Sequence, residues 1–160
     1  MLFPDLAHRG THRLQTIWGL FAVPVLVVIA LVAIGGPHPA STNASLFAAI
    51  AGVVALIDFG SLFWIRGVGA GAVLAADSNG EIRDAYSRRM VMACSFAAIP
   101  SLLAFTFVIV AGITTAFYLI SAASLGLLVF AGPRRADIDS LDDRMVEAGR
   151  PFRVAAALDS

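Results

Sequence analysis

The charged residues leave two long stretches of the chain without any charge. No charged side chain occurs between Arg13 and Asp58, and none occurs between Arg89 and Arg134. Each stretch has more than 40 residues. As a single helix, each would be ~65 Å long, roughly twice the ~30 Å hydrocarbon core of a bilayer. Each stretch is therefore predicted to cross a membrane twice, as two helices joined by a turn.

The composition agrees with a membrane protein and excludes other classes. Hydrophobic residues make up 59% of the chain and charged residues 14%, whereas soluble domains carry roughly 45–50% and about 25%. A core of this size cannot bury such an excess of apolar residues. A soluble monomer and a disordered chain are excluded, and the single Cys94 excludes a secreted disulfide scaffold. The net charge of zero implies no nucleic-acid partner.

Turn signals divide the two stretches into four spans. Gly-Gly and two prolines mark a solvated loop at 36–44, and Gly112 starts a tighter turn at 112–115. The prediction is an all-α polytopic membrane protein with a membrane domain over 1–135, a helical hairpin at 67–88 and an acidic tail at 136–160. The four predicted spans are 15–35, 45–66, 89–111 and 115–131.

All basic residues of the chain are arginines, and they fall on one side of the predicted topology. The two outer loops, 36–44 and 112–115, contain none. Cytoplasmic loops of membrane proteins carry the excess of Lys and Arg. This distribution predicts that both termini are cytoplasmic.

The chain also carries the signs of an internal repeat. With a shift of 76 residues, Arg13 aligns with Arg89 and Pro24 with Pro100. We expect two tandem helical hairpins in the same orientation, related by an axis along the membrane normal. Pro24 and Pro100 would kink their helices at matching depths. Chance similarity between apolar segments, and the ordinary frequency of proline in membrane helices, are the alternatives.

Two capping patterns predict helices outside the membrane. Ser78 followed by Glu81 is typical of a capping box and predicts a helix from Asn79. Ser140 followed by Asp143 predicts a second helix start, in a tail helix that we expect to be solvated. The charged side chains at the start of the third span are also expected to be solvated: Arg83, Asp84, Arg88 and Arg89.

Asp58 is the one carboxylate inside a predicted span. An aspartate near the centre of a membrane helix costs about 2.5–3.5 kcal/mol, so it normally faces a partner or a wet cavity. Asp58 is therefore a candidate ion-binding residue; the alternative is a protonated side chain that donates one structural hydrogen bond. Small residues beside it predict a face for close helix packing: Ala48, Ala51, Gly52 and Ala55.

Tandem hairpins with one carboxylate in the second span resemble the proteolipid (c) subunits of rotary ATPases. The chain is also similar to small uncharacterised bacterial four-helix membrane proteins that are proteolipid-like. Three segments carry this similarity: 13–19, 97–112 and 127–135. In that group the third span often bears a glutamate, and Ala98 stands in its place here. The resemblance implies a ring or other oligomer in a bacterial plasma (inner) membrane, without catalytic activity.

The predicted spans contain few residues that could carry out catalysis. No membrane-embedded His/Glu metal set and no nucleophile beside a base occur in the spans, so we expect no catalytic residues, no metal and no cofactor. The expected partners are the lipid bilayer and either further copies of the chain or other membrane subunits. The sequence favours an oligomerising or accessory subunit of a larger membrane complex. The first alternative is a proton- or cation-translocating oligomer that uses Asp58, and the second is a small-molecule transporter component.

Overall fold

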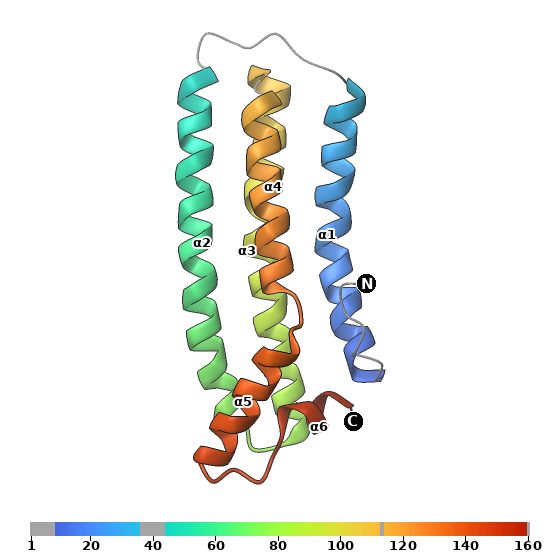
Figure 1. Ribbon diagram of the computed structural model, residues 1–160, viewed down its shortest axis with the longest axis vertical. Helices are drawn as coiled ribbons and strands as arrows, with labels where there is room; N and C mark the ends of the chain where they lie inside the picture. The colour runs from blue at the N-terminus through green and yellow to red at the C-terminus, as the bar shows by residue number, and fades with distance from the viewer. Residues whose placement is uncertain (1–8, 36–43, 113, 160) are drawn as a thin grey trace.

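The computed structural model describes residues 9–35, 44–112 and 114–159. Within these ranges the chain forms helices and turns without a strand. The helices lie side by side along the long axis, except for the two C-terminal ones, which lie at one end (Figure 1). In chain order they are α1 (Arg9–Gly35), α2 (Ala44–Leu74), α3 (Asn79–Ala111), α4 (Thr114–Ala131), α5 (Arg135–Glu147) and α6 (Val154–Asp159).

The first four helices are long and apolar enough to cross a membrane. The segments that meet this condition are His12–Gly35, Gly52–Leu74, Asn79–Val110 and Thr114–Ala131. A helix needs about 20 apolar residues to span the hydrocarbon core. The prediction of an all-α chain with four such helices is confirmed, and the chain has the fold of a multi-pass membrane protein.

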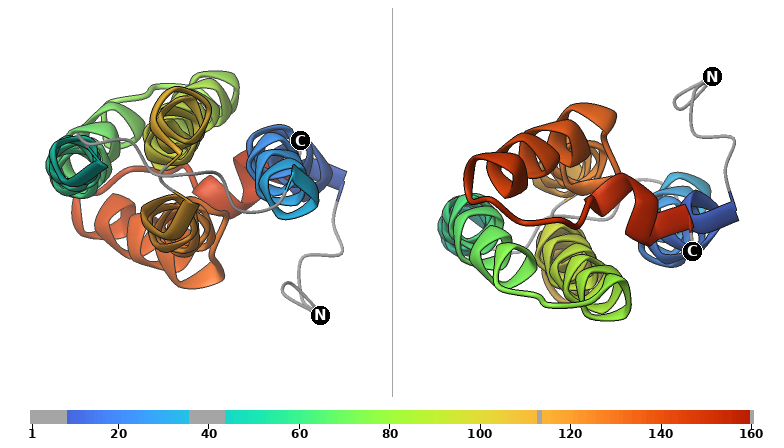
Figure 2. Two further views of the ribbon diagram at one scale, coloured as in Figure 1. Left: turned by 90° about the horizontal axis from the view of Figure 1, so that it is seen from above. Right: turned by 90° about the horizontal axis from the view of Figure 1, so that it is seen from below.

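The four long helices are arranged around a central pair. Helices α3 and α4 pack against each other, and both α1 and α2 contact this pair. Viewed along the bundle, α1 and α2 lie on opposite sides of it (Figure 2). Among the described residues, α1 and α2 do not contact each other. The first predicted hairpin is thus packed differently from the second, and the tandem repeat stays a prediction from the sequence.

The two prolines of the predicted repeat lie in different surroundings. Both α1 and α3 continue through their prolines as helices. Pro24 is exposed on α1, whereas Pro100 is fully buried among the helices around α3. The aligned arginines differ in the same way, since Arg13 is exposed and Arg89 is buried. Matched kinks at the two prolines stay a prediction.

The turn before α3 follows the predicted capping pattern with one difference. Ser78 is the N-cap, and its Oγ accepts a hydrogen bond from the Glu81 N–H at 3.2 Å. The Glu81 carboxylate reaches back one residue further than in a standard capping box: it accepts from the Asp77 N–H at 2.9 Å. The predicted start of this helix at Asn79 is confirmed.

The turn after α3 is tight because of one glycine. Gly112 adopts the left-handed conformation with φ 69°, and its N–H donates to the Val108 carbonyl at 2.9 Å. A left-handed residue after the last turn is the usual way to end a helix and reverse the chain. This turn brings α4 back along α3, so that α3 and α4 form the central pair.

Two apolar clusters hold the bundle together. The smaller one joins α1, α3 and α4 near the α3–α4 turn and contains Val28, Val32, Ala104, Val108 and Phe117. The larger one includes residues of all six helices. On α5, Ile138, Leu141 and Met145 are buried in this larger cluster. Their spacing places them on one helix face, which closes that end of the bundle.

Candidate functional site

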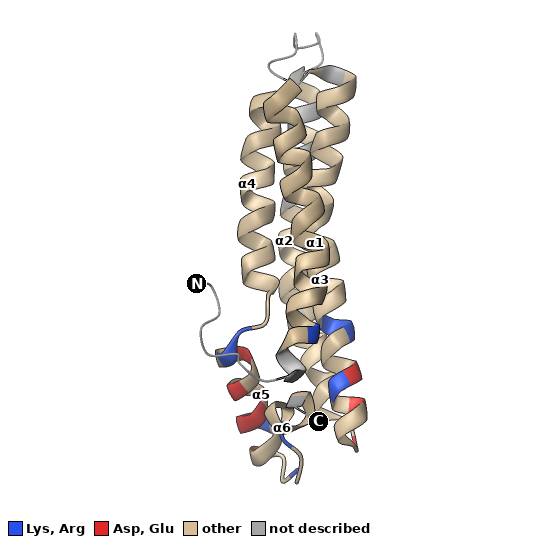
Figure 3. Ribbon diagram, turned by 90° about the vertical axis from the view of Figure 1, so that its right-hand side faces the viewer, with Lys and Arg blue, Asp and Glu red and all other residues tan. Residues whose placement is uncertain are grey.

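The charged side chains gather at one end of the bundle. Figure 3 shows blue and red segments on the first turns of α3 and on α5, with the other ends of the four long helices uncharged in the described part. We call this the charged end, and we call α5 and α6 together the C-terminal cap. The cap contacts α1, α2 and α3 at the charged end. The site described next lies where the cap meets the bundle.

A bidentate ion pair joins α3 to the cap. Nη1 of Arg89 lies 3.0 Å from Oδ2 of Asp137, and Nη2 lies 3.1 Å from Oδ1. Both guanidinium prongs are therefore paired with both carboxylate oxygens, which is the strong, directional form of this interaction. Arg89 is only 8% exposed. The expectation that Arg89 is solvated is wrong, because the cap folds back over it.

The partner of Arg89 is placed by the way α5 begins. Asp137 lies in the first turn of α5, where backbone N–H groups and the helix dipole favour a negative charge. The N-cap of α5 is Arg134, which makes no side-chain capping hydrogen bond. The predicted helix start at Ser140 is wrong, since Ser140 lies inside α5. The earlier start turns Asp137 toward α3.

Gly69 on α2 makes room for the arginine stem. A Cβ at this position would lie 2.7 Å from Cγ and 2.9 Å from Cδ of Arg89. Real Cβ atoms do not approach other atoms so closely, so only glycine leaves the arginine in this position. The ion pair thus depends on three helices, with α2 giving space, α3 the cation and α5 the anion.

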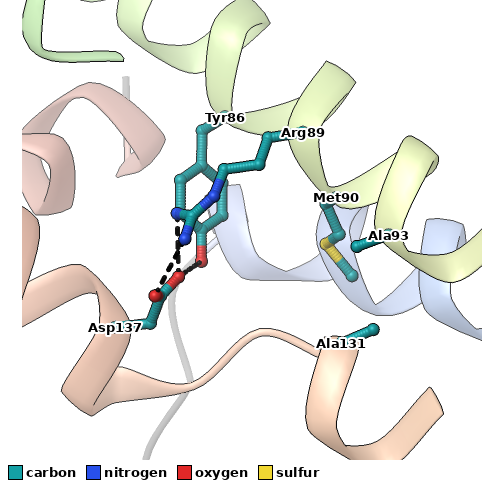
Figure 4. Close-up of a pocket in the computed structure, with 6 residues that line it drawn as sticks. All are labelled: Tyr86, Arg89, Met90, Ala93, Ala131 and Asp137. Atoms are coloured by element: carbon teal, nitrogen blue, oxygen red, sulfur yellow. Dashed lines mark hydrogen bonds and ion pairs between the residues drawn. The ribbon is translucent and has the colours of Figure 1, made fainter. Parts of the chain in front are cut away.

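Tyr86 completes the junction on the α3 side. The Arg89 guanidinium carbon lies 5.9 Å from the centroid of the Tyr86 ring, and the Tyr86 hydroxyl donates to Oδ2 of Asp137 at 3.5 Å. Figure 4 shows the ring and the guanidinium pointing together at Asp137. The contact with the ring adds a modest cation–π attraction to the ion pair.

A small cavity adjoins this junction. It measures about 20 Å³, and its lining is shown in Figure 4: Tyr86, Arg89, Met90, Ala93, Ala131 and Asp137. This is room for a single water molecule. Sites for small-molecule ligands have volumes of about 300–1,000 Å³. The cavity at the junction is therefore far smaller than a site for such a ligand.

A second ion pair holds the far side of the cap. Arg150, in the turn between α5 and α6, pairs with Asp77 in the turn between α2 and α3. Within the cap, the Asp142 carboxylate accepts a hydrogen bond from the Val154 N–H at the start of α6. Two ion pairs therefore connect the cap to the bundle, and one hydrogen bond connects the two helices of the cap.

The membrane part holds a buried pair of serines. The Ser101 and Ser121 hydroxyls lie 2.9 Å apart and join α3 to α4. Ser124, one turn further along α4, is fully buried, and its Oγ has no hydrogen-bond partner among the described residues. Serine pairs of this kind hold membrane helices together. Ser121 and Ser124 are three residues apart on α4, a spacing that places both on one helix face.

The structure describes the side chains of only some residues of the site that was predicted from the sequence. Backbone of α2 runs through Asp58, but its side chain lies outside the described residues, as do the side chains of Ala48, Ala51 and Ala55. Gly52 is described, and a Cβ added there would meet no atom within 4 Å. Ion binding at Asp58 and close packing at Gly52 stay predictions. Among the described residues, no cluster of three or more potential metal ligands occurs.

No family model, no curated protein and no solved structure matches the chain. The fold and the site alone therefore define its class. It is an all-α protein with four helices suited to crossing a membrane, closed at its charged end by a two-helix cap.

Proposed function

We propose that the chain is a non-enzymatic integral membrane protein that works as an oligomerising or accessory subunit of a larger membrane complex. The observation that carries this proposal is the outward face of α2. Three glycines on this face, Gly60, Gly67 and Gly71, are exposed, and a Cβ on any of them would meet no atom within 4 Å. Within the described part of the chain, no side chain packs against these three glycine positions.

Helical register places the three glycines on one stripe. Leu56, which is 73% exposed, lies four residues before Gly60. Gly67 follows Gly60 by seven residues, and Gly71 follows Gly67 by four. Glycine inside a helix costs roughly 0.5–1 kcal/mol relative to alanine. Small residues four apart, as Gly67 and Gly71 are, let the backbones of two membrane helices approach closely, whereas the exposed Phe63 lies between Gly60 and Gly67 at the edge of this face. The stripe therefore supports an interface with a helix of another chain.

The position of α2 in the bundle supports the same proposal. Its described contacts are with α3, α4 and the cap, and it has no contact with α1. One side of α2 is thus available along most of its length. Lipid can cover apolar side chains on such a surface, but it gives no reason for a row of glycines. We place the charged end and both termini in the cytoplasm, because all arginines of the sequence fall on this side of the predicted topology.

Proton or cation translocation through Asp58 is the alternative. This alternative rests on Asp58 being the one carboxylate inside a span predicted from the sequence, where a charged side chain is costly and normally faces a partner or a wet cavity. A role as a small-molecule transporter component is the second alternative, without an observation that favours it.

The proposal is tested by the mass of the complex in mild detergent. Gly60→Leu should weaken association at least about fivefold, because the added side chain separates the two backbones. Gly126→Leu is the matched control, since Gly126 is an exposed glycine on α4 that also has open space around its Cβ position. A wild-type protein that is monomeric and binds no other subunit, or equal effects of the two variants, would contradict the proposal.

A further inference from the structure

The end of α4 holds one arginine in a defined position. Pro133 has no N–H, so it cannot donate to the Val129 carbonyl as the next helical residue would. Nη2 of Arg134 donates to this carbonyl instead, at 3.4 Å. The guanidinium carbon of Arg134 also lies 4.9 Å from the centroid of the Phe130 ring. Two contacts thus hold the guanidinium against the end of α4 while most of its N–H groups are left for another acceptor.

A row of aromatic rings leads away from this arginine along the bundle. Phe130 on α4 lies 5.9 Å from Phe63 on α2, and Phe63 lies 5.1 Å from Phe59, one turn further into the span. Phe59 and Phe63 are both exposed, Phe63 by 56%. The rings bridge α2 and α4 on an outer side of the bundle. Together with Arg134 they form a continuous surface, the Arg134–Phe59 track, with a cation at one end and apolar rings behind it.

The cation of this track is not neutralised within the described part of the chain. Arg134 is exposed and makes no ion pair with a described carboxylate, and the nearest acidic residue along the chain, Asp137, is paired with Arg89. An exposed guanidinium next to apolar rings at the edge of a span is suited to a partner that carries both an anion and an apolar part. The bilayer provides such a partner in the same leaflet.

We propose that the Arg134–Phe59 track binds one anionic phospholipid. The phosphate accepts hydrogen bonds from the Arg134 guanidinium, whose planar fork matches two phosphate oxygens. One acyl chain lies along Phe130, Phe63 and Phe59. Arg135 lies beside this site and is exposed, but it makes neither a ring contact nor a carbonyl contact in the described structure. Arg134 therefore selects the lipid, while Arg135 adds only to the general attraction of anionic surfaces.

The test is the number of lipids that stay bound to the purified, delipidated protein. Dioleoyl phosphatidylglycerol and dioleoyl phosphatidylcholine are added in detergent, and bound lipid is counted by native mass spectrometry. One phosphatidylglycerol should be retained in preference to phosphatidylcholine. Arg134→Gln should lower its occupancy at least about fivefold, whereas Arg135→Gln, the control that removes the same charge, should keep most of it. Arg134→Lys should give an intermediate occupancy, because the charge remains but the planar fork is lost.

The acyl part of the site has its own pair of variants. Phe63→Ala should reduce retention of phosphatidylglycerol, while Ile109→Ala, which truncates a 70% exposed side chain on α3, a helix without a residue in the track, should not. Inorganic phosphate at millimolar concentration should fail to displace the lipid. Equal losses in Arg134→Gln and Arg135→Gln would overturn the proposal in favour of unspecific attraction. Displacement by phosphate alone would overturn it in favour of a simple anion site.

Discussion

Gly69 of α2 and Arg89 of α3 lie so close that an added Cβ at residue 69 would come within 2.7 Å of the arginine Cγ. The far end of the same arginine is held by both carboxylate oxygens of Asp137. The aliphatic part of the Arg89 side chain is confined by α2, and its guanidinium is paired with Asp137. The side chain therefore cannot move aside without breaking the ion pair. This relationship ties the position of α2 to the docking of the C-terminal cap.

Gly69→Ala is therefore expected to displace Arg89 and loosen the cap. Adding a methyl group at a filled position costs about 1–3 kcal/mol. Gly126→Ala on α4 is the matched control, because a Cβ at residue 126 would meet no atom within 4 Å. Thermal unfolding in detergent should show a lower midpoint for Gly69→Ala and a similar or higher midpoint for Gly126→Ala. Equal midpoints for the two variants would show that Arg89 has another position available.

Asp137→Asn should release the cap without unfolding the membrane helices. It leaves the nearly buried Arg89 charge without its anion, a loss of the order of 3 kcal/mol. Trypsin cleavage in the cap, after Arg144 or Arg153, should become at least about tenfold faster, because docked helices resist proteases. Asp139→Asn removes an exposed acidic residue from the same helix and should cleave like wild type. Unchanged cleavage in Asp137→Asn would mean that apolar packing alone holds the cap.

Ser101 and Ser121 should show coupling in a double-mutant cycle. Each single change to alanine leaves the other hydroxyl without its partner, so the double variant should lose less stability than the sum of the two single variants. Hydrogen bonds between membrane helices contribute about 0.6 kcal/mol on average, and the coupling energy should be of this size. Reversible unfolding in mixed micelles measures it. Strictly additive losses would indicate that the two hydroxyls do not bond.

The fourth prediction concerns a single variant, Asp58→Asn. Under the proposed accessory role, Asp58→Asn should insert, assemble and behave like wild type, because the amide keeps the hydrogen-bonding ability of the side chain and is cheaper to bury than a charge. Proteoliposomes with an imposed potential should show no proton uptake with either protein. Proton uptake by wild type that Asp58→Asn abolishes would establish the translocation alternative instead.

The four long helices could be predicted from the sequence because the bilayer leaves few options. Backbone groups within lipid must be satisfied inside the segment, which makes an uncharged stretch of sufficient length a helix. The gap between Arg89 and Arg134 thus determined α3 and α4, and Gly112 marked their turn. The start of α3 followed from Ser78 and Glu81, since a capping pattern acts through neighbouring residues.

The neighbours of each helix could not be predicted in the same way. An apolar side chain that faces lipid and one that faces another helix look alike in a sequence, because both surroundings are apolar. The separation of α1 from α2 by the central pair has no local signal for this reason. The repeat suggested by Pro24 and Pro100 also gave no information on burial, which differs between the two residues.

The Arg89–Asp137 junction was missed because its partners are 48 residues apart. Charges in the sequence indicate the end of a span, but not which of them become paired and buried. One signal was available in the tail: Ile138, Leu141 and Met145 recur at spacings of three and four, as on the buried face of a helix. This pattern predicts a packed helix, and the acidic residues between these positions obscured it.

The outward face of α2 is the centre of the proposed function, and photo-crosslinking in native membranes tests it directly. A benzoylphenylalanine placed at Leu56, beside the glycine stripe, should give a discrete protein adduct of fixed mass. The same probe at Leu119, which is 70% exposed on α4, should react with lipid alone. An adduct with a second copy indicates an oligomer, and an adduct of another mass indicates a different subunit. If the probe at residue 56 gives only lipid-modified monomer, as at residue 119, α2 has no protein partner and the account is contradicted.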